Sequence, residues 1–262
     1  MSVVTLEGEF VHYEVLGRGR PLIFLHGWVG SWRYWIPTMQ ATSTAFRAYS
    51  LDLWGFGDSS KRSELYTLEQ QVGLLEGFLE AMGIGKIAIV GHGLGAVIAA
   101  SYATRHRDAV DRVMAIGFPL GYDAISPRLR NSSLSELADW LLGRSPVTEA
   151  ARAEAPKADP KAIAASLDDI QNIDLSRLSQ DLPIPCLLVH GQNDPVVEPP
   201  PLDSSPSLPE LSHYIAFEQS GHFPMLDEPS KYNRLLNDFL TLSSGESPRQ
   251  LQLKEEWKRR VR

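Results

Sequence analysis

Cysteine is nearly absent from this chain: Cys186 is the single one among 262 residues, which excludes an intramolecular disulfide framework. Basic residues are outnumbered, with 25 Lys and Arg against 32 Asp and Glu, so the net charge of −7 gives no sign of a nucleic-acid partner. No apolar run approaches the roughly 18 residues of a membrane span. Residues 1–10 lack the basic start and apolar core of a secretion signal. We therefore expect a cytoplasmic protein without membrane contact.

Apolar residues make up 43% of the chain, enough to bury the core of a single α/β domain. Apolar runs alternate with helical patterns, which predicts an α/β fold with a mostly parallel sheet flanked by helices. The first two expected strands form a hairpin at Gly8. Eight strands are predicted, at Val3–Leu6, Phe10–Leu16, Pro21–Leu25, Phe46–Leu51, Ile87–Val90, Val113–Ile116, Cys186–Val189 and Tyr214–Phe217. Helices are expected at Leu68–Met82, Leu94–His106 and Ser230–Leu242.

Residues 120–181 break this alternation. They contain the helical patterns Leu134–Leu142, Val147–Ala155 and Ile163–Ile170 with no strand between them. We expect a small helical cap over the site, inserted into a core formed by residues 1–119 and 182–242. The alternative is that these helices only cover one side of the sheet.

The tail, residues 243–262, begins with polar residues and ends with Leu253, Trp257 and Val261 spaced four apart. This spacing predicts a short helix that docks one apolar stripe on the protein. Its basic end leaves contact with an anionic membrane surface as the alternative.

A serine is missing at the most informative position. Residues 91–95 read Gly-His-Gly-Leu-Gly directly after a predicted buried strand and before a predicted helix. A strand, a sharp glycine turn and a helix are the setting of the nucleophile elbow, G-x-S-x-G. Gly93 stands at the nucleophile position, and glycine has no side chain with which to attack a carbonyl.

Further motifs follow in a consistent order. Residues 26–30 read His-Gly-Trp-Val-Gly after the third expected strand, and residues 52–59 read Asp-Leu-Trp-Gly-Phe-Gly-Asp-Ser after the fourth. Residues 191–197 read Gly-Gln-Asn-Asp-Pro-Val-Val, and residues 221–225 read Gly-His-Phe-Pro-Met. Together with the elbow, these stretches resemble the α/β-hydrolase superfamily over residues 3–242. Five motifs in register make a chance match improbable.

The resemblance implies a role for several residues. Asp194 would orient His222, and His222 would act as general base. The backbone N–H groups of Trp28 and Leu94 would form the oxyanion hole.

We expect the substrate to be a small apolar molecule or ester, bound beside Trp28, Phe223, Gly27 and His92. No cluster has metal-ligand spacing, and no glycine-rich loop has the register of a phosphate site, so neither a metal nor a cofactor is predicted. The sequence leaves open whether the chain is a monomer or a homodimer.

The leading functional hypothesis is a carboxylic-ester or related acyl hydrolase scaffold with Gly93 at the nucleophile position. A cofactor-free lyase or oxygenase-like enzyme, in which Asp194 and His222 abstract a proton, is the first alternative. A catalytically inactive ligand-binding homologue is the second. Gly93 itself has two explanations: a substitution introduced into a working serine hydrolase, or a native glycine that relieves backbone strain in the turn.

Overall fold

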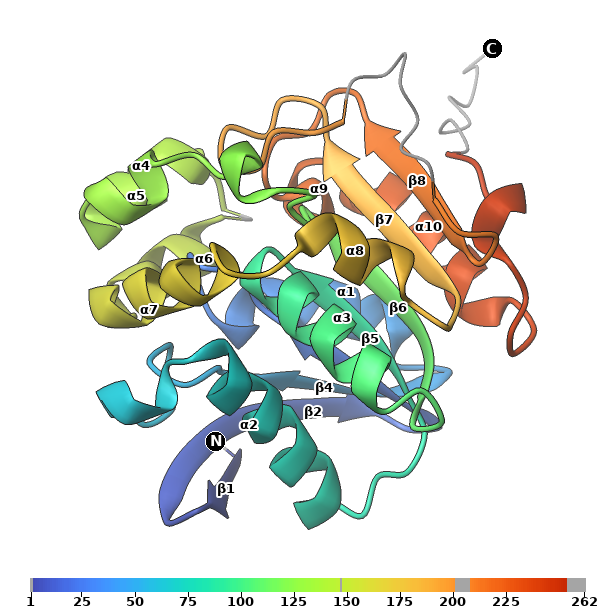
Figure 1. The fold of residues 1–262 in the computed structure, drawn as a ribbon, viewed down its shortest axis with the longest axis horizontal. Helices are drawn as coiled ribbons and strands as arrows, with labels where there is room; N and C mark the ends of the chain where they lie inside the picture. Colours follow the sequence, from blue (N-terminus) through green and yellow to red (C-terminus); the bar gives the residue numbers. More distant parts are fainter. Residues whose placement is uncertain (1, 147, 201–207, 254–262) are drawn as a thin grey trace.

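One twisted sheet organises the computed structural model, which describes residues 2–146, 148–200 and 208–253. Its eight strands lie in the order β1-β2-β4-β3-β5-β6-β7-β8, which confirms the predicted number (Figure 1). The strands are β1 (Ser2–Leu6), β2 (Glu9–Gly17), β3 (Arg20–Leu25), β4 (Phe46–Leu51), β5 (Ile87–His92), β6 (Val110–Ile116), β7 (Cys186–Gly191) and β8 (Ser212–Phe217).

The sheet is mostly parallel, as predicted. Strands β1 and β2 pair antiparallel with Leu6 opposite Glu9, which places the hairpin turn at Glu7 and Gly8. Strand β2 also runs antiparallel to β4, and all pairs from β4 through β3 to β8 are parallel. Every residue of β5 and β7 is buried, because a parallel sheet is covered by helices on both faces. The carboxyl ends of the parallel strands therefore meet at one edge, where sites form in such sheets.

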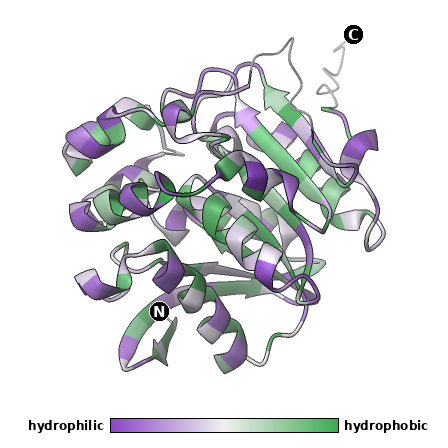
Figure 2. Ribbon diagram, viewed as in Figure 1, coloured by the Kyte–Doolittle hydropathy of each residue, from purple (hydrophilic) through white to green (hydrophobic). Residues whose placement is uncertain are grey.

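Helices cover the two faces of the sheet. Figure 1 shows α2 (Leu68–Ala81) and α3 (Leu94–Arg105) on one face, with α1 (Ile36–Thr42) and α10 (Pro229–Thr241) on the other. Helix α2 starts at the N-cap Thr67, whose side chain accepts from the Gln70 amide, and buries one apolar face. Figure 2 shows hydrophobic residues along the central strands and mixed hydropathy on the surrounding helices.

Between β6 and β7 the described residues form helices and no strand. These are η3 (Tyr122–Ala124), α4 (Arg128–Asn131), α5 (Leu134–Leu141), α6 (Glu149–Glu154), η4 (Ala155–Lys157), α7 (Pro160–Ile170) and α8 (Leu175–Gln180). Helices α4 and α8 were not among the predicted helical patterns, because they are too short to show periodicity. Helix α5 begins with a complete capping box between Ser133 and Glu136, and α7 begins at the N-cap Asp159.

Helix α7 and its N-cap are tied to loops at the carboxyl edge of the sheet. The Asp159 amide donates to the Gly55 carbonyl at 2.7 Å, and the Tyr66 hydroxyl donates to the Asp159 carboxylate at 2.9 Å. Near the end of α7, the Asp169 carboxylate accepts from the Leu68 amide at 2.6 Å. These contacts hold α7 against the loop after β4 and the start of α2.

The remaining elements are short: η1 (Trp32–Trp35), η2 (Ser63–Leu65), α9 (Pro224–Asp227) and η5 (Pro248–Gln250). The tail helix predicted around Trp257 and Val261 falls outside the described residues, so it stays a prediction. No helix in the described part of the chain is long and apolar enough to cross a membrane.

Candidate active site

The turn at Gly93 has the backbone shape that the elbow motif predicts. Strand β5 ends at His92, Gly93 follows with φ 51° and ψ −111°, and α3 begins at Leu94. This left-handed conformation strains residues that have a Cβ and suits glycine. Close packing also fixes the flanking glycines: a Cβ on Gly91 would lie 2.3 Å from the Gly95 carbonyl oxygen, and one on Gly95 would lie 2.4 Å from the Leu25 carbonyl oxygen.

The indole of Trp28 occupies the space beside Gly93. A Cβ built on Gly93 would lie 3.0 Å from both Cε3 and Cζ3 of that ring. Trp28 is completely buried, and its Nε1 donates to the Ser166 hydroxyl in α7 at 3.0 Å. The residue therefore connects the loop after β3, the turn at Gly93 and α7.

Asp194 and His222, separated by 28 residues, come together as the resemblance implies. The His222 Nδ1 lies 2.8 Å from Asp194 Oδ2, and both side chains are only 1% exposed. Asp194 Oδ1 accepts from the amides of Val196 and Val197 at 2.8 and 3.1 Å. Burial raises the pKa of Asp194, but the charge and hydrogen bond of His222 and the two amides outweigh it and lower the pKa overall. An ionised Asp194 fixes the proton of neutral His222 on Nδ1 and leaves Nε2 as the basic nitrogen.

Two backbone donors remain unused at the turn. The N–H groups of Trp28 and Leu94 donate to no acceptor within the residues that the structure describes. Three neighbouring amides are engaged: Gly27 N–H donates to Tyr34, Gly93 N–H to the Ile116 carbonyl and Gly95 N–H to the His26 carbonyl. Leu94 is the first residue of α3, where the helix dipole adds a partial positive charge. Free N–H groups at this turn can stabilise an oxyanion.

The other residues expected beside the substrate lie around the dyad. The Phe223 ring centroid is 5.1 Å from that of His222 and 4.9 Å from that of His92. Phe223 is 2% exposed and His92 is fully buried. Both ring nitrogens of His92 are hydrogen-bonded to the protein, Nδ1 to the Tyr34 hydroxyl and Nε2 to the His222 carbonyl. Substrate contact by these residues stays a prediction.

Three residues that were not predicted from the sequence complete this arrangement: Tyr34, Ser166 and Gly117. Gly117 follows β6 with φ 57°, and a Cβ there would lie 3.6 Å from both Asp194 Oδ2 and His222 Cε1. A glycine directly after a parallel strand was an available signal for Gly117. Tyr34 and Ser166 carry no local pattern, because their partners are distant in the sequence.

A cluster of possible metal ligands joins strand β2 to the loop after β4. Single ligand atoms of His12, Asp52 and Asp58 lie within 4.8 Å of one another. Asp52 accepts from the amides of Trp32 and Asp58 and lies 2.9 Å from His12 Nδ1. Lys157 contacts Asp58 at 3.0 Å. Because its polar groups are hydrogen-bonded to the protein and paired with the Lys157 ammonium group, the cluster is a structural element that supports the loop.

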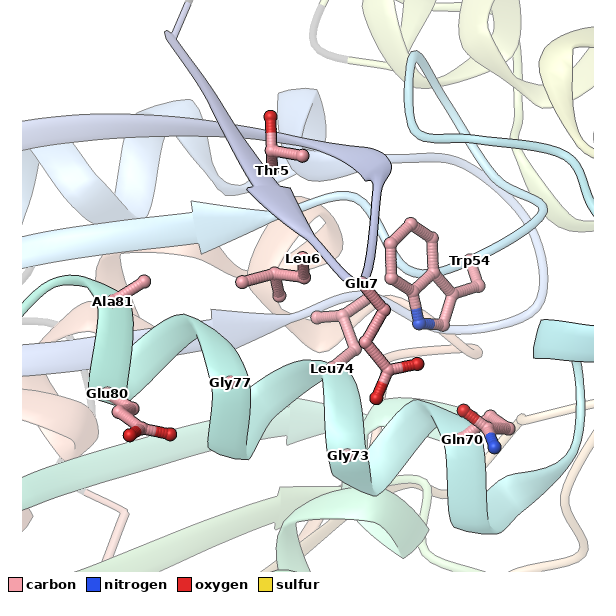
Figure 3. A pocket seen from close by; sticks show the side chains of 10 residues that line it. All are labelled: Thr5, Leu6, Glu7, Trp54, Gln70, Gly73, Leu74, Gly77, Glu80 and Ala81. Atoms are coloured by element: carbon pink, nitrogen blue, oxygen red, sulfur yellow. The ribbon is translucent and has the colours of Figure 1, made fainter.

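A cavity of about 470 Å³ opens between the β1–β2 turn and α2 (Figure 3). Its wall includes Gly73 and Gly77 of α2 and the indole of Trp54, with Glu7 and Glu80 beside it. None of its lining residues belongs to the dyad or to the turn at Gly93. This cavity is therefore separate from the candidate active site.

The parallel sheet, the glycine turn into α3 and the histidine–aspartate pair define a protein of the α/β-hydrolase type. The family described as alpha/beta hydrolase fold matches residues 20–158. The chain belongs to this family.

Relatives match nearly the whole chain. A pimeloyl-[acyl-carrier protein] methyl ester esterase of Vibrio cholerae is 27% identical, over 88% of this chain and 98% of that protein. A 2-hydroxy-6-oxo-2,4-heptadienoate hydrolase of Pseudomonas putida is 26% identical, over 86% of this chain and 90% of that protein. Among solved structures, a thermophilic esterase from Thermogutta terrifontis superposes with a TM-score of 0.75 at 22% identity, over 91% of this chain and 96% of that one. This structural likeness concerns the fold.

Proposed function

We propose that this chain is a small-molecule carboxylic-ester or related acyl hydrolase in which His222 activates water in place of a serine. The observation that carries the proposal is the buried pair of His222 and Asp194 at 2.8 Å, combined with the unused N–H groups of Trp28 and Leu94. A base and an oxyanion site are the two parts that attack on a carbonyl requires. The relatives named as a methyl ester esterase and a hydrolase support the same reaction class.

The reaction has two steps. His222 Nε2 takes a proton from water while the water oxygen bonds to the carbonyl carbon, and the carbonyl oxygen becomes an oxyanion held by the N–H groups of Trp28 and Leu94. The oxyanion then reforms the carbonyl as the bond to the leaving alcohol breaks, and the imidazolium of His222 returns the proton to that alcohol. Asp194 stays ionised and stabilises the imidazolium throughout. No acyl-enzyme forms, because Gly93 has no nucleophilic atom.

The surroundings of the dyad support an apolar substrate. Trp28, Gly27, His92 and Phe223 would lie beside the acyl group, and residues 120–181 would act as a cap above it. The hydrogen bond from Trp28 to Ser166 supports this cap assignment because it joins α7 to the loop after β3. We further propose that the chain works in the cytoplasm as a monomer or homodimer.

The test measures hydrolysis of p-nitrophenyl butyrate by the unaltered chain and by Gly93→Ser, each with and without His222→Ala. We expect slow turnover by the unaltered chain that disappears in His222→Ala. In a well-studied protease, loss of the triad leaves roughly 10³–10⁴-fold catalysis over water, which sets the scale for detection. His106→Ala is the matched control, since His106 lies at the end of α3 and is 33% exposed. Turnover at the buffer rate, or turnover unaffected by His222→Ala, would overturn the proposal.

A second readout uses the serine variant. If Gly93→Ser hydrolyses the ester faster and reacts with a fluorophosphonate only when His222 is present, the geometry is that of a serine-hydrolase site. A folded Gly93→Ser variant that does neither contradicts the assignment of Asp194 and His222 as its dyad.

A further inference from the structure

A continuous chain of hydrogen bonds runs through the buried side chains behind the candidate active site. The Gly27 N–H donates to the Tyr34 hydroxyl oxygen at 2.7 Å. The Tyr34 hydroxyl lies 2.9 Å from His92 Nδ1, and His92 Nε2 lies 2.9 Å from the carbonyl oxygen of His222. Tyr34 is 2% exposed and His92 is fully buried, so water does not compete for these partners.

Chemistry fixes the direction of each bond. A carbonyl oxygen only accepts, so His92 Nε2 must carry a proton and donate it to His222. Burial holds the pKa of His92 well below its ordinary value, so the ring is neutral and Nδ1 is an acceptor. The Tyr34 hydroxyl therefore donates to Nδ1 while it accepts from Gly27. Burial also raises the pKa of Tyr34 well above its ordinary value, which keeps its proton in place.

The two ends of this chain adjoin the two functional parts of the proposed site. Gly27 precedes Trp28, whose N–H would hold the oxyanion, and the other end is the backbone of His222, the proposed base. His92 lies in β5, immediately before Gly93. A Cβ on Gly27 would lie 3.0 Å from His92 Nδ1, so this close approach depends on glycine.

We propose that His92 and Tyr34 are positioning residues that fix the oxyanion loop and the loop of His222 at a set distance on either side of Gly93. The proposal rests on the proposed function for its catalytic consequence, while the positioning itself concerns the folded chain. His92 acts through His222 and Gly27. Its ring centroid lies 4.4 Å from that of His222, so its neutral state also avoids repulsion when His222 takes a proton.

Two matched substitutions separate the two hydrogen bonds of His92, the one at Nδ1 with Tyr34 and the one at Nε2 with His222. In His92→Gln, the side-chain amide nitrogen falls near the former Nε2 and can still donate to the His222 carbonyl. In His92→Asn, the amide oxygen falls near the former Nδ1 and can still accept from Tyr34, but nothing reaches His222. Tyr34→Phe provides an independent variant, because it keeps the ring and removes the hydroxyl from both Gly27 and His92.

The first readout is the proton NMR resonance of the His222 Nδ1–H, which reports its hydrogen bond to Asp194 and needs no catalytic activity. We expect this resonance to keep its position in His92→Gln and to shift or broaden in His92→Asn. Unfolding in urea, measured on each variant, shows which of them are folded. Identical resonances in folded His92→Asn, folded Tyr34→Phe and the unaltered chain would overturn the proposal.

The second readout is ester hydrolysis in a Gly93→Ser background. We expect kcat to fall about tenfold in His92→Asn, which loses the contact with His222, and by a smaller factor in His92→Gln, which keeps that contact and loses the one with Tyr34. KM should change less than about twofold in both variants. If the role of His92 were purely structural, both variants would contain less folded protein, and kcat of the folded enzyme would not differ between His92→Asn and His92→Gln. If no variant has activity but the NMR difference is present, the positioning stands and the proposed function fails. If activity is present and Asn and Gln behave alike in both readouts, the positioning fails and the proposed function stands.

Discussion

Trp28 and Gly93 fit each other: the edge of the indole lies where a side chain at position 93 would begin, with Cε3 and Cζ3 3.0 Å from the Cβ that glycine lacks. The indole is fully buried and anchored through Nε1 to Ser166. Position 93 thus favours glycine for two separate reasons, the left-handed backbone and the neighbouring ring. The structure gives a native glycine at this turn a physical basis beyond relief of strain.

Replacing Gly93 by alanine should destabilise the chain by about 2–3 kcal/mol, because left-handed strain costs about 1–2 kcal/mol and the Trp28 ring must also move. Gly83→Ala is the matched control, since Gly83 has φ 63° and no atom lies within 4 Å of an added Cβ. Urea unfolding of both variants measures the difference. If both substitutions lower the free energy of unfolding equally, the Trp28 ring moves aside at no cost in stability.

Much of this fold could be predicted from the sequence because its strands are short apolar runs that end in glycine, aspartate or histidine. The proximity of Asp194 and His222 was also predictable, since both occupy loops that follow such runs and the family resemblance pairs them. Their catalytic roles stay a proposal. The start of β6 was not: Val110 begins the strand, but Asp111 and Arg112 interrupt the apolar pattern. Arg112 is buried there because its guanidinium donates to the carbonyls of Phe239 and Leu242 near the end of α10.

Two contacts could not be predicted from the sequence: the one between Tyr34 and His92 and the one between Trp28 and Ser166. The first pair is separated by 58 residues and the second by 138. Neither tyrosine in an aromatic stretch nor serine in an amphipathic helix carries a local sign of such a partner. These pairings follow from tertiary packing, which local periodicity does not encode.

Stability should fall as the pH drops below about 6.5, the ordinary histidine pKa. Burial lowers the pKa of His190 to about 4, although its hydrogen bond to the Phe118 carbonyl and the charge of Asp194 act in the opposite direction. Between these two values the unfolded chain binds a proton that the folded chain does not. The contribution of His190 is therefore fully present above pH 6.5 and is lost on acidification, by up to about 1.4 kcal/mol per pH unit.

The measurement compares the free energy of unfolding at pH 7.5 and 5.0 for the unaltered chain and for His190→Gln, whose amide can still donate to Phe118. The unaltered chain should lose more stability over this interval, by about 1–2 kcal/mol. His26 and His92, whose pKa values burial also lowers, titrate equally in both proteins and cancel in the comparison. Parallel pH profiles for the two proteins would contradict the assignment to His190.

The bond from Trp28 to Ser166 should make a measurable contribution to holding α7 on the core. Ser166→Ala leaves the buried Nε1–H of Trp28 without an acceptor, which costs about 1–3 kcal/mol. Ser179→Ala in α8 is a close control, because both serines are buried and both hydroxyls donate to the carbonyl three residues earlier, Ile163 and Ser176. Only Ser166 also accepts from Trp28.

We expect Ser166→Ala to lower the free energy of unfolding by at least about 1 kcal/mol more than Ser179→Ala. Hydrogen exchange across Pro160–Ile170 should accelerate in Ser166→Ala, since the lost contact is between α7 and the core. A double-mutant cycle with Trp28→Phe isolates the pair: once the indole donor is gone, nothing is left unpaired, so Ser166→Ala should then cost no more than Ser179→Ala. If Ser166→Ala still lowers the free energy of unfolding more than Ser179→Ala in the Trp28→Phe background, the effect comes from packing inside α7. If the two serine substitutions cost the same in the unaltered chain, the bond to Trp28 does not hold this helix on the core.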